Sequence, residues 1–274
     1  MKISVIIPCY NRAHTLSRAL ESVLGQTRQA DQIIVVDDAS TDETKALLSC
    51  YPMVETLFLS HNQGVSAARN AGLKHASHEW IALLDSDDEW LAEKLQRQVE
   101  AIAFNPDIRI FHTDEVWIRN GKRVNAMNKH AKPDGHAYQA SLALCCVSPS
   151  SILMHRSVLD ECGVFDESLP ACEDYDLWLR LFHRYPVHLI DEALLIKYGG
   201  HEDQLSRQYW GMDRFRVQAL IKMLDAQCLN AEDDALSRAM LLKKCQVLIN
   251  GAHKRENTQR ASKYTAIIEQ YCHV

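Results

Sequence analysis

The stretch that decides the fold reads IIVVDDASTDE at residues 33–43, an apolar run that changes at once into an acidic, hydroxyl-rich turn. Four consecutive β-branched residues favour a strand that is covered on both faces. The segment from Ser40 to Glu43 then predicts a capping box at the start of a helix, in which Ser40 and Glu43 exchange hydrogen bonds. A buried strand that leads directly into a capped helix is the repeating unit of an α/β fold.

The same unit recurs through the first half of the chain. Apolar runs at 3–7, 54–59 and 80–84 predict three more strands. Apolar stripes at helical spacing predict helices over 16–24, over 65–76 and from Leu91 to a point just before Pro106. This alternation predicts an open, mostly parallel sheet with right-handed crossovers, and its ligands should lie at the carboxyl ends of the strands.

The pattern changes in the second half. Strand-like pieces at 108–117 and 151–155 are mixed with loops, and helical spacing returns around Leu177. After Gly199 only amphipathic helical patterns remain, at 215–224, 236–248 and 264–271. We therefore expect an α/β domain over residues 1–205 and an all-helical extension over residues 206–274.

Composition and charge narrow the class of protein. The 274 residues carry a formal net charge of -6, which gives the chain as a whole no electrostatic reason to bind nucleic acid. Nine cysteines, an odd number without a CxxC pair, favour free thiols in the cytosol over a disulfide framework. The first apolar run stops at Pro8, and no later run approaches the roughly 20 residues that a bilayer requires. These features predict a cytoplasmic protein.

Acidic side chains cluster where such a sheet would place its site. Asp37-Asp38 follows one predicted strand, the run from Asp85 to Asp88 follows another, and Glu173-Asp174 opens a predicted helix. Any one cluster could simply cap a helix. Carboxylates gathered in one crevice repel each other unless a cation lies among them, and Mg²⁺ or Mn²⁺ prefers such oxygen ligands.

Five motifs, in order over residues 3–205, resemble family-2 inverting glycosyltransferases. They are VIIPCYNR (5–12) followed by SVLGQT (22–27), VVDDASTD (35–42), NQGVSAARNAG (62–72), LDSDD (84–88) and EDYDLWLR (173–180). The resemblance implies the GT-A fold, an α/β domain that binds a nucleotide sugar. It also implies a nucleotide-diphosphate donor, most simply a UDP-sugar, and a saccharide or lipid-linked acceptor.

The resemblance further implies a role for each matching position. The loop that contains Pro8, Tyr10 and Arg12 should border the base and ribose, and Asp38 should accept a hydrogen bond from the base. Asp85 and Ser86 should face the ribose, Asp87 should bind the metal on the diphosphate, and Asp174 should be the catalytic base. Asp88 remains an alternative metal ligand, because the acidic run has one member more than a DxD triplet needs. His201 is expected to complete the donor or metal site, with a surface-loop histidine as the alternative.

Several residues carry a second interpretation. Arg69, expected at the nucleotide, could instead serve helix packing, and Trp178 is interpreted as a core residue rather than a sugar platform. Residues 241–274 hold six Lys or Arg against two Glu, a bias that suits either a solvated helix face or contact with an anionic membrane. The same helices could pair two copies of the chain.

Three other classes of protein share parts of this pattern. A DxD phosphatase would need a hydroxyl residue where this chain has Glu89, and a sugar nucleotidyltransferase would need a glycine-rich first loop. A non-catalytic module that binds a nucleotide sugar or a partner protein on the same fold is the third alternative.

Overall fold

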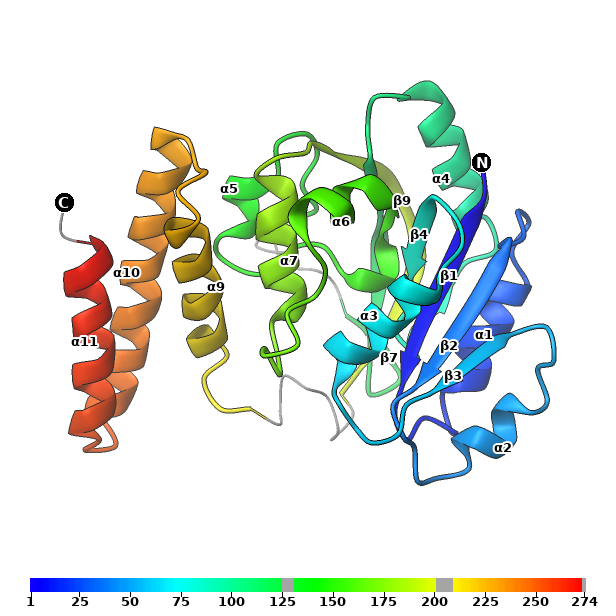
Figure 1. The fold of residues 1–274 in the computed structure, drawn as a ribbon, viewed down its shortest axis with the longest axis horizontal. Helices are drawn as coiled ribbons and strands as arrows, with labels where there is room; N and C mark the ends of the chain where they lie inside the picture. The colour runs from blue at the N-terminus through cyan, green and yellow to red at the C-terminus, as the bar shows by residue number, and fades with distance from the viewer. Residues whose placement is uncertain (125–130, 201–208, 273–274) are drawn as a thin grey trace.

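The computed structural model describes residues 1–124, 131–200 and 209–272, and its centre is one mixed sheet (Figure 1). Four strands pair in parallel in the order β3-β2-β1-β4, as the apolar runs predicted. Their bounds are β1 (Ile3–Cys9), β2 (Gln32–Asp37), β3 (Glu55–Phe58) and β4 (Trp80–Leu83). The carboxyl ends of these strands therefore meet at one edge, where the acidic clusters follow them.

The second half of the sheet contains antiparallel pairs. Strand β8 (Leu153–His155) lies antiparallel between β4 and β6 (Ile110–Arg119), and β7 (Lys122–Val124) forms a hairpin with β6. Strand β9 (Val187–Gly199) runs parallel to β6 and carries β5 (Glu89–Trp90) at its other edge. The expected GT-A-type α/β sheet with flanking helices is confirmed. The long strand β9 was not predicted.

Helices cover both faces of the sheet because its strands alternate between two hydrophobic cores. In β1, Ile3, Val5 and Ile7 enter one core and Ile6 enters the other. The bounds of the covering helices are α1 (Leu16–Leu24), α2 (Thr44–Leu48), α3 (Val65–His75), α4 (Lys94–Phe104), α5 (Tyr138–Ser141), α6 (Arg156–Cys162) and α7 (Glu173–Phe182). Trp178 is fully enclosed in the core, as expected.

The predicted C-terminal helices are present as α9 (Asp213–Asp225), α10 (Ala231–His253) and α11 (Thr258–Cys272). Figure 1 shows them side by side at the end of the molecule farthest from β3, with α7 between α9 and the sheet. Their buried side chains belong to the same hydrophobic cluster as those of α7. The boundary expected at residue 205 lies outside the described residues. None of the helices in the described parts of the chain is both long and apolar enough to span a bilayer.

Two local predictions were wrong. The capping box is absent because Ser40 Oγ accepts from the backbone N–H of Asn11 instead, and Asp42 Oδ1 accepts from the N–H of Thr44, where α2 begins. The helix expected from Leu91 begins at Lys94, since Trp90 belongs to a short strand beside β9. All nine cysteines are free thiols.

Candidate active site

The loop after β1 is held against the loop after β2 by side chains from both. Asn11 has a left-handed backbone with φ of 53°, its N–H donates to Ser40 Oγ at 2.8 Å, and its Oδ1 accepts from Thr41 N at 2.8 Å. Arg12 N donates to Thr44 Oγ1 at 3.0 Å. These bonds fix the segment from Pro8 to Arg12 at the carboxyl edge of the sheet and leave Tyr10 exposed.

Asp38 fixes the start of α3. Its Oδ1 accepts from Gln63 N at 2.8 Å and its Oδ2 from Gly64 N at 2.7 Å. The side chain is buried, and burial raises its pKa although the two N–H groups lower it. Each carboxylate oxygen has a second lone pair, so the expected hydrogen bond from a base is compatible with these contacts.

Asp88 is bound within the fold. Ser150 Oγ donates to its Oδ2 at 2.7 Å, and the backbone N–H of Tyr198 in β9 donates to its Oδ1 at 3.2 Å. The side chain is 2% exposed, and burial raises its pKa well above the ordinary value. The same Ser150 Oγ accepts from Asp85 N at 3.0 Å, so one serine fixes both ends of the acidic run.

Asp87 has different surroundings from Asp88. Its backbone oxygen accepts from Arg18 Nη2 at 2.6 Å. Burial and the charge of Asp85 raise the pKa of the Asp87 carboxyl, while Arg12 and Lys197 lower it. The carboxylates of Asp87 and Asp85 therefore lie close together, beside the positive charges of Arg12 and Lys197. Ser86, between the two aspartates in the chain, is buried.

Arg69 joins two of the acidic clusters. From α3, its Nη2 donates to Asp85 Oδ1 at 2.7 Å and its Nη1 to Glu173 Oε1 at 2.6 Å. The residue is 3% exposed, and although burial lowers its pKa, the two carboxylates raise it above the usual value. The structure thus brings the run that follows β4 and the start of α7 to one guanidinium. The expected contact of Arg69 with a nucleotide stays a prediction.

Asp174 lies half-buried in the first turn of α7, next to Glu173. Its Oδ1 accepts from the backbone N–H of Tyr175 at 2.6 Å, and its Oδ2 accepts from Cys145 Sγ at 3.2 Å. Burial and the neighbouring Asp174 raise the pKa of the Cys145 thiol well above its ordinary value, so the thiol keeps its proton. Its single hydrogen is shared between Asp174 Oδ2 and the carbonyl of Val147, which lies 3.3 Å from Sγ. Sequence reasoning missed this contact, because nothing in the Cys145-Cys146 pair indicates a partner.

Lys197 is a second residue that sequence reasoning missed. It lies in β9, one position before the backbone N–H that binds Asp88. Burial lowers its pKa, but the charges of Glu115, Asp88, Asp85 and Asp174 together raise it above the usual range. The ammonium group therefore provides a fixed positive charge among four carboxylates from three separate segments, namely β6, the acidic run after β4 and the start of α7. Sequence reasoning missed Lys197 because it did not predict strand β9, which carries this residue.

The metal prediction can be compared with the donor atoms present. Within the described ranges, no three His, Cys, Asp or Glu side chains are grouped as a ready-made metal site, and the predicted ligand His201 lies outside those ranges. Mg²⁺ commonly uses only one or two protein carboxylates together with substrate phosphates. The Asp87 carboxylate fits that mode, because it supplies hard oxygen ligands without a closed protein cage.

Fold and site together define an α/β protein of the GT-A class, and comparison with known proteins gives its family. A model described as glycosyl transferase family 2 matches residues 4–163, and the chain belongs to that family. The solved structure of Staphylococcus aureus TarS 1–349 in complex with UDP-GlcNAc superposes with a TM-score of 0.81 at 20% identity. That match covers 99% of this chain and 81% of the other.

Two relatives illustrate the range of similarity. One is an Escherichia coli protein named UDP-Glc:alpha-D-GlcNAc-diphosphoundecaprenol beta-1,3-glucosyltransferase WfgD. It is 34% identical over 181 residues, which cover 65% of this chain and 69% of that protein. The other, an uncharacterized glycosyltransferase of Rickettsia conorii, is 32% identical over 217 residues, or 75% of this chain. The match spans only 35% of the Rickettsia protein's length.

Proposed function

We propose that this chain is an inverting glycosyltransferase that moves a sugar from a UDP-sugar to a hydroxyl of a saccharide or lipid-linked acceptor, with Mn²⁺ or Mg²⁺ on the donor. The observation that carries the proposal is the ion pair of Arg69 with both Asp85 and Glu173. It sets the acidic run expected to hold the donor beside the carboxylate expected to act as base. The names of WfgD and of the TarS complex, which mention UDP-Glc and UDP-GlcNAc, support the donor class.

The donor is assigned to the edge formed by β1, β2 and β4. Pro8, Tyr10 and Arg12 would border the base and ribose, Asp38 would accept from the base, and Asp85 with Ser86 would face the ribose. Asp87, with His201, would hold the metal, which when bound would neutralise negative charge on the diphosphate. Asp88 is the weaker candidate ligand, because Ser150 and Tyr198 already bind its two oxygens.

The acceptor is assigned to the side of Asp174. This carboxylate would take the proton of the acceptor hydroxyl as that oxygen bonds to the anomeric carbon. The bond from the anomeric carbon to the diphosphate breaks in the same step, and UDP leaves with the electron pair. Arg12 and Lys197 face the acidic run with positive charge, which favours the departing diphosphate.

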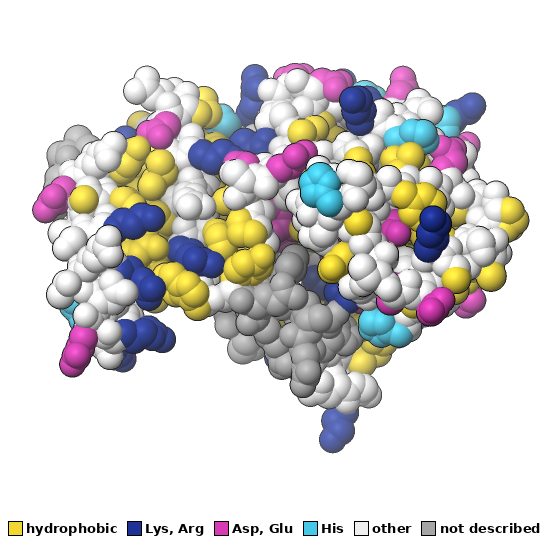
Figure 2. Space-filling view, turned by 60° about the horizontal axis from the view of Figure 1, so that its bottom comes forward, with side chains coloured by type: hydrophobic (Ala, Val, Ile, Leu, Met, Phe, Trp, Pro, Cys, Tyr) yellow, Lys and Arg dark blue, Asp and Glu magenta, His cyan; other side chains and the backbone are white. Residues whose placement is uncertain are grey.

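The outer face of the C-terminal helices is the surface that we assign to two further partners, a membrane and a second copy of the chain. Figure 2 shows apolar and basic side chains intermingled over this end of the molecule. The exposed apolar residues in this region include Trp210, Leu236, Leu242 and Val247. Contact with the cytoplasmic face of a membrane that holds a lipid-linked acceptor is one proposed use of this face, and pairing with a second copy is the other.

Release of UDP from donor sugars tests the proposal. The protein is incubated with UDP-glucose or UDP-GlcNAc and Mn²⁺ without acceptor, so that transfer to water is slow but measurable. We expect UDP release by the parent and at least about 100-fold less by Asp174→Asn, which keeps the shape but removes the base. UDP affinity should stay within a few-fold. A chain that binds UDP but releases none from either sugar would be the non-catalytic module.

A further inference from the structure

The start of α7 is held by residues of the C-terminal helices as well as by the sheet. We propose that α9 and α10 position the Asp174 carboxylate for catalysis, with Lys222 and Lys244 as the positioning residues. The proposal rests on the proposed function of Asp174 as the base, and it gives the helical end of the chain a part in the site.

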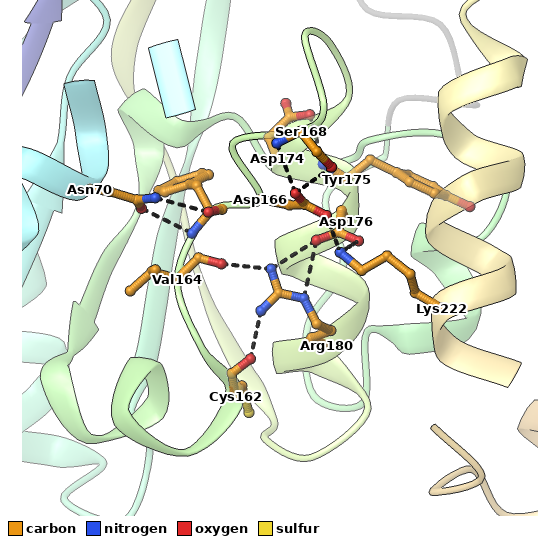
Figure 3. A network of polar contacts seen from close by, with 11 residues as sticks. Asn70, Cys162, Val164, Asp166, Ser168, Asp174, Tyr175, Asp176, Arg180 and Lys222 are labelled. Carbon is orange, nitrogen blue, oxygen red and sulfur yellow. Dashed lines mark hydrogen bonds and ion pairs between the residues drawn. The ribbon is translucent and has the colours of Figure 1, made fainter. Parts of the chain in front are cut away.

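Lys222 of α9 binds carboxylates on both sides of Asp174 in the chain. Its Nζ lies 2.6 Å from Asp166 Oδ2 and 2.7 Å from Asp176 Oδ1 (Figure 3). Asp176 is in the first turn of α7 and is 1% exposed, and its other oxygen accepts from Arg180 at 2.8 Å. One ammonium group therefore links α9 to the turn that carries Asp174 and to the loop that precedes it.

The loop held by Lys222 also reaches the donor side. Asp166 Oδ1 accepts from Ser168 N at 2.9 Å, which shapes the loop before α7. Next to it in the chain, Phe165 exchanges two hydrogen bonds with Asn70: Asn70 Nδ2 donates to its carbonyl at 2.9 Å, and its N–H donates to Asn70 Oδ1 at 3.1 Å. Asn70 follows Arg69 in α3. The contacts thus run without a break from α9 to the guanidinium between Asp85 and Glu173.

Lys244 of α10 provides a second link, on the other side of Asp174. It is buried, and its Nζ donates to the carbonyl of Ala143 at 2.8 Å. Two residues further on, Cys145 donates its thiol hydrogen to Asp174 Oδ2. The segment before Ala143 is fixed as well, because Tyr175 Oη donates to Leu142 O at 2.8 Å. The loop that contacts the carboxylate is therefore clamped between α7 and α10.

Each oxygen of Asp174 accepts from a residue that lies one or two positions in the chain from a residue bound by one of these lysines. Oδ1 accepts from the N–H of Tyr175, and the following residue, Asp176, binds Lys222. Oδ2 accepts from Cys145, which lies two residues after Ala143, whose carbonyl binds Lys244. A general base must lie within hydrogen-bond reach of its proton, and a displacement of about 1 Å can cost on the order of 100-fold in rate. Loss of either lysine should release one of the two oxygens.

The test compares Lys222→Met and Lys244→Met with Lys243→Met. Lys243 precedes Lys244 on the same helix but is exposed, so its replacement serves as a matched control. The measurements are kcat and KM for UDP release from UDP-glucose or UDP-GlcNAc, UDP affinity, and hydrogen exchange of the peptide covering residues 172–177. We expect kcat to fall about 10-fold or more in the first two variants while donor KM and UDP affinity stay within about two-fold. Exchange of the peptide should be several-fold faster in Lys222→Met, and Lys243→Met should match the parent.

The outcomes that would overturn the positioning role of the two lysines can be stated in advance. Parent-like kcat and parent-like exchange in both variants would overturn the positioning role, and so would a fall in kcat that only follows the folded fraction measured by circular dichroism. Lys222→Arg, which keeps the charge, should recover most of the rate, and it replaces the Met variant if that variant does not fold. Parent-like UDP release by Asp174→Asn would instead reject Asp174 as the base. The exchange result, which needs no turnover, would still report on the scaffold.

Discussion

Asp87 and Asp88 are adjacent in the chain, yet their surroundings separate their roles. Asp88 is enclosed and bound by Ser150 and the backbone of Tyr198, whereas Asp87 faces Asp85 and the cations around it. We expect Asp87→Ala to fold normally and to lose the Mn²⁺ dependence of UDP binding, measured by calorimetry with and without the metal. Mn²⁺-stimulated binding at the parent level would remove Asp87 from the metal site.

Asp88→Asn provides the contrasting case. The amide cannot accept at both positions at once. If its Oδ1 keeps the Tyr198 N–H, its NH2 group faces Ser150 Oγ, whose own hydrogen then loses its carboxylate acceptor in the buried pocket. We expect a loss of about 1–3 kcal/mol in the free energy of unfolding, measured with urea. Unchanged stability together with lost metal dependence would exchange the roles of the two residues.

His112 gives a pH dependence whose sign can be worked out. The ring is fully buried, and burial lowers its pKa to about 4, although its hydrogen bond to Pro133 O raises it. The unfolded chain binds this proton near pH 6.5, so the unfolded state holds more protons between about pH 6.5 and 4. Stability is therefore present in full above pH 6.5 and is lost as the pH falls toward 4.

The contribution of His112 can be isolated with a variant that does not titrate. Between pH 7 and pH 5 this residue should remove about 2 kcal/mol of stability from the parent. His112→Gln, which keeps a side-chain N–H donor, should lose correspondingly less stability over the same range in urea titrations. An equal loss in both proteins would show that His112 does not control the acid sensitivity.

The residues that sequence reasoning found were those marked by local pattern. Asp38, the run from Asp85 to Asp88, and Asp174 each follow a strand or open a helix, so their positions could be predicted. Cys145 and Lys197 reach the site only through tertiary packing, and no neighbour in the chain signals their partners. The chemical roles assigned to the site residues come from the family resemblance and stay predictions.

Helix α3 lies very close to the sheet at Gly72. A Cβ on Gly72 would overlap Ile6 Cγ2 and would lie 3.2 Å from Val36 Cγ2, both in the buried core between helix and strands. We expect Gly72→Ala to lower the free energy of unfolding by about 1–3 kcal/mol, because the core must move to admit the methyl group.

Gly251 supplies the matched control, since it is also a helical glycine, in α10. There an added Cβ would meet only Arg255 Nη1, at 3.3 Å, and that side chain can swing away. Gly251→Ala should raise the free energy of unfolding by about 0.5–1 kcal/mol through the lower entropy of the unfolded chain. Urea denaturation of the two variants should therefore give shifts of opposite sign.

Strand β9 shows why part of the fold could not be predicted. Its register with β6 shifts where Thr113 pairs with Ile190 and Asp114 pairs with Ala193, so Asp191 and Glu192 are extra residues on β9. These two exposed acidic residues interrupt the apolar pattern, and the pairing partner lies far away in the sequence. Strands β1, β2 and β4 were predictable because each contains a near-continuous apolar run.

The whole molecule should unfold as one unit. Side chains of α9, α10 and α11 share a hydrophobic cluster with α3 and α7, and that cluster continues into the sheet. We expect a single calorimetric transition whose van't Hoff and calorimetric enthalpies agree. UDP with Mn²⁺ should move that transition upward by mass action. Two separate transitions would show that the helices form an independent unit.

The order in which the strands are synthesised differs from their order in space. Strand β9 is synthesised last and lies between β6 and β5, and its Tyr198 N–H binds Asp88 across a sequence separation of 110 residues. At about 5–20 residues per second, a ribosome needs roughly 5–20 s to make that stretch. Strands β1 to β4, completed by residue 83, can therefore associate on the nascent chain while the Asp88 carboxylate still faces water. The buried surroundings of Asp88 are completed only after residue 198 has been synthesised.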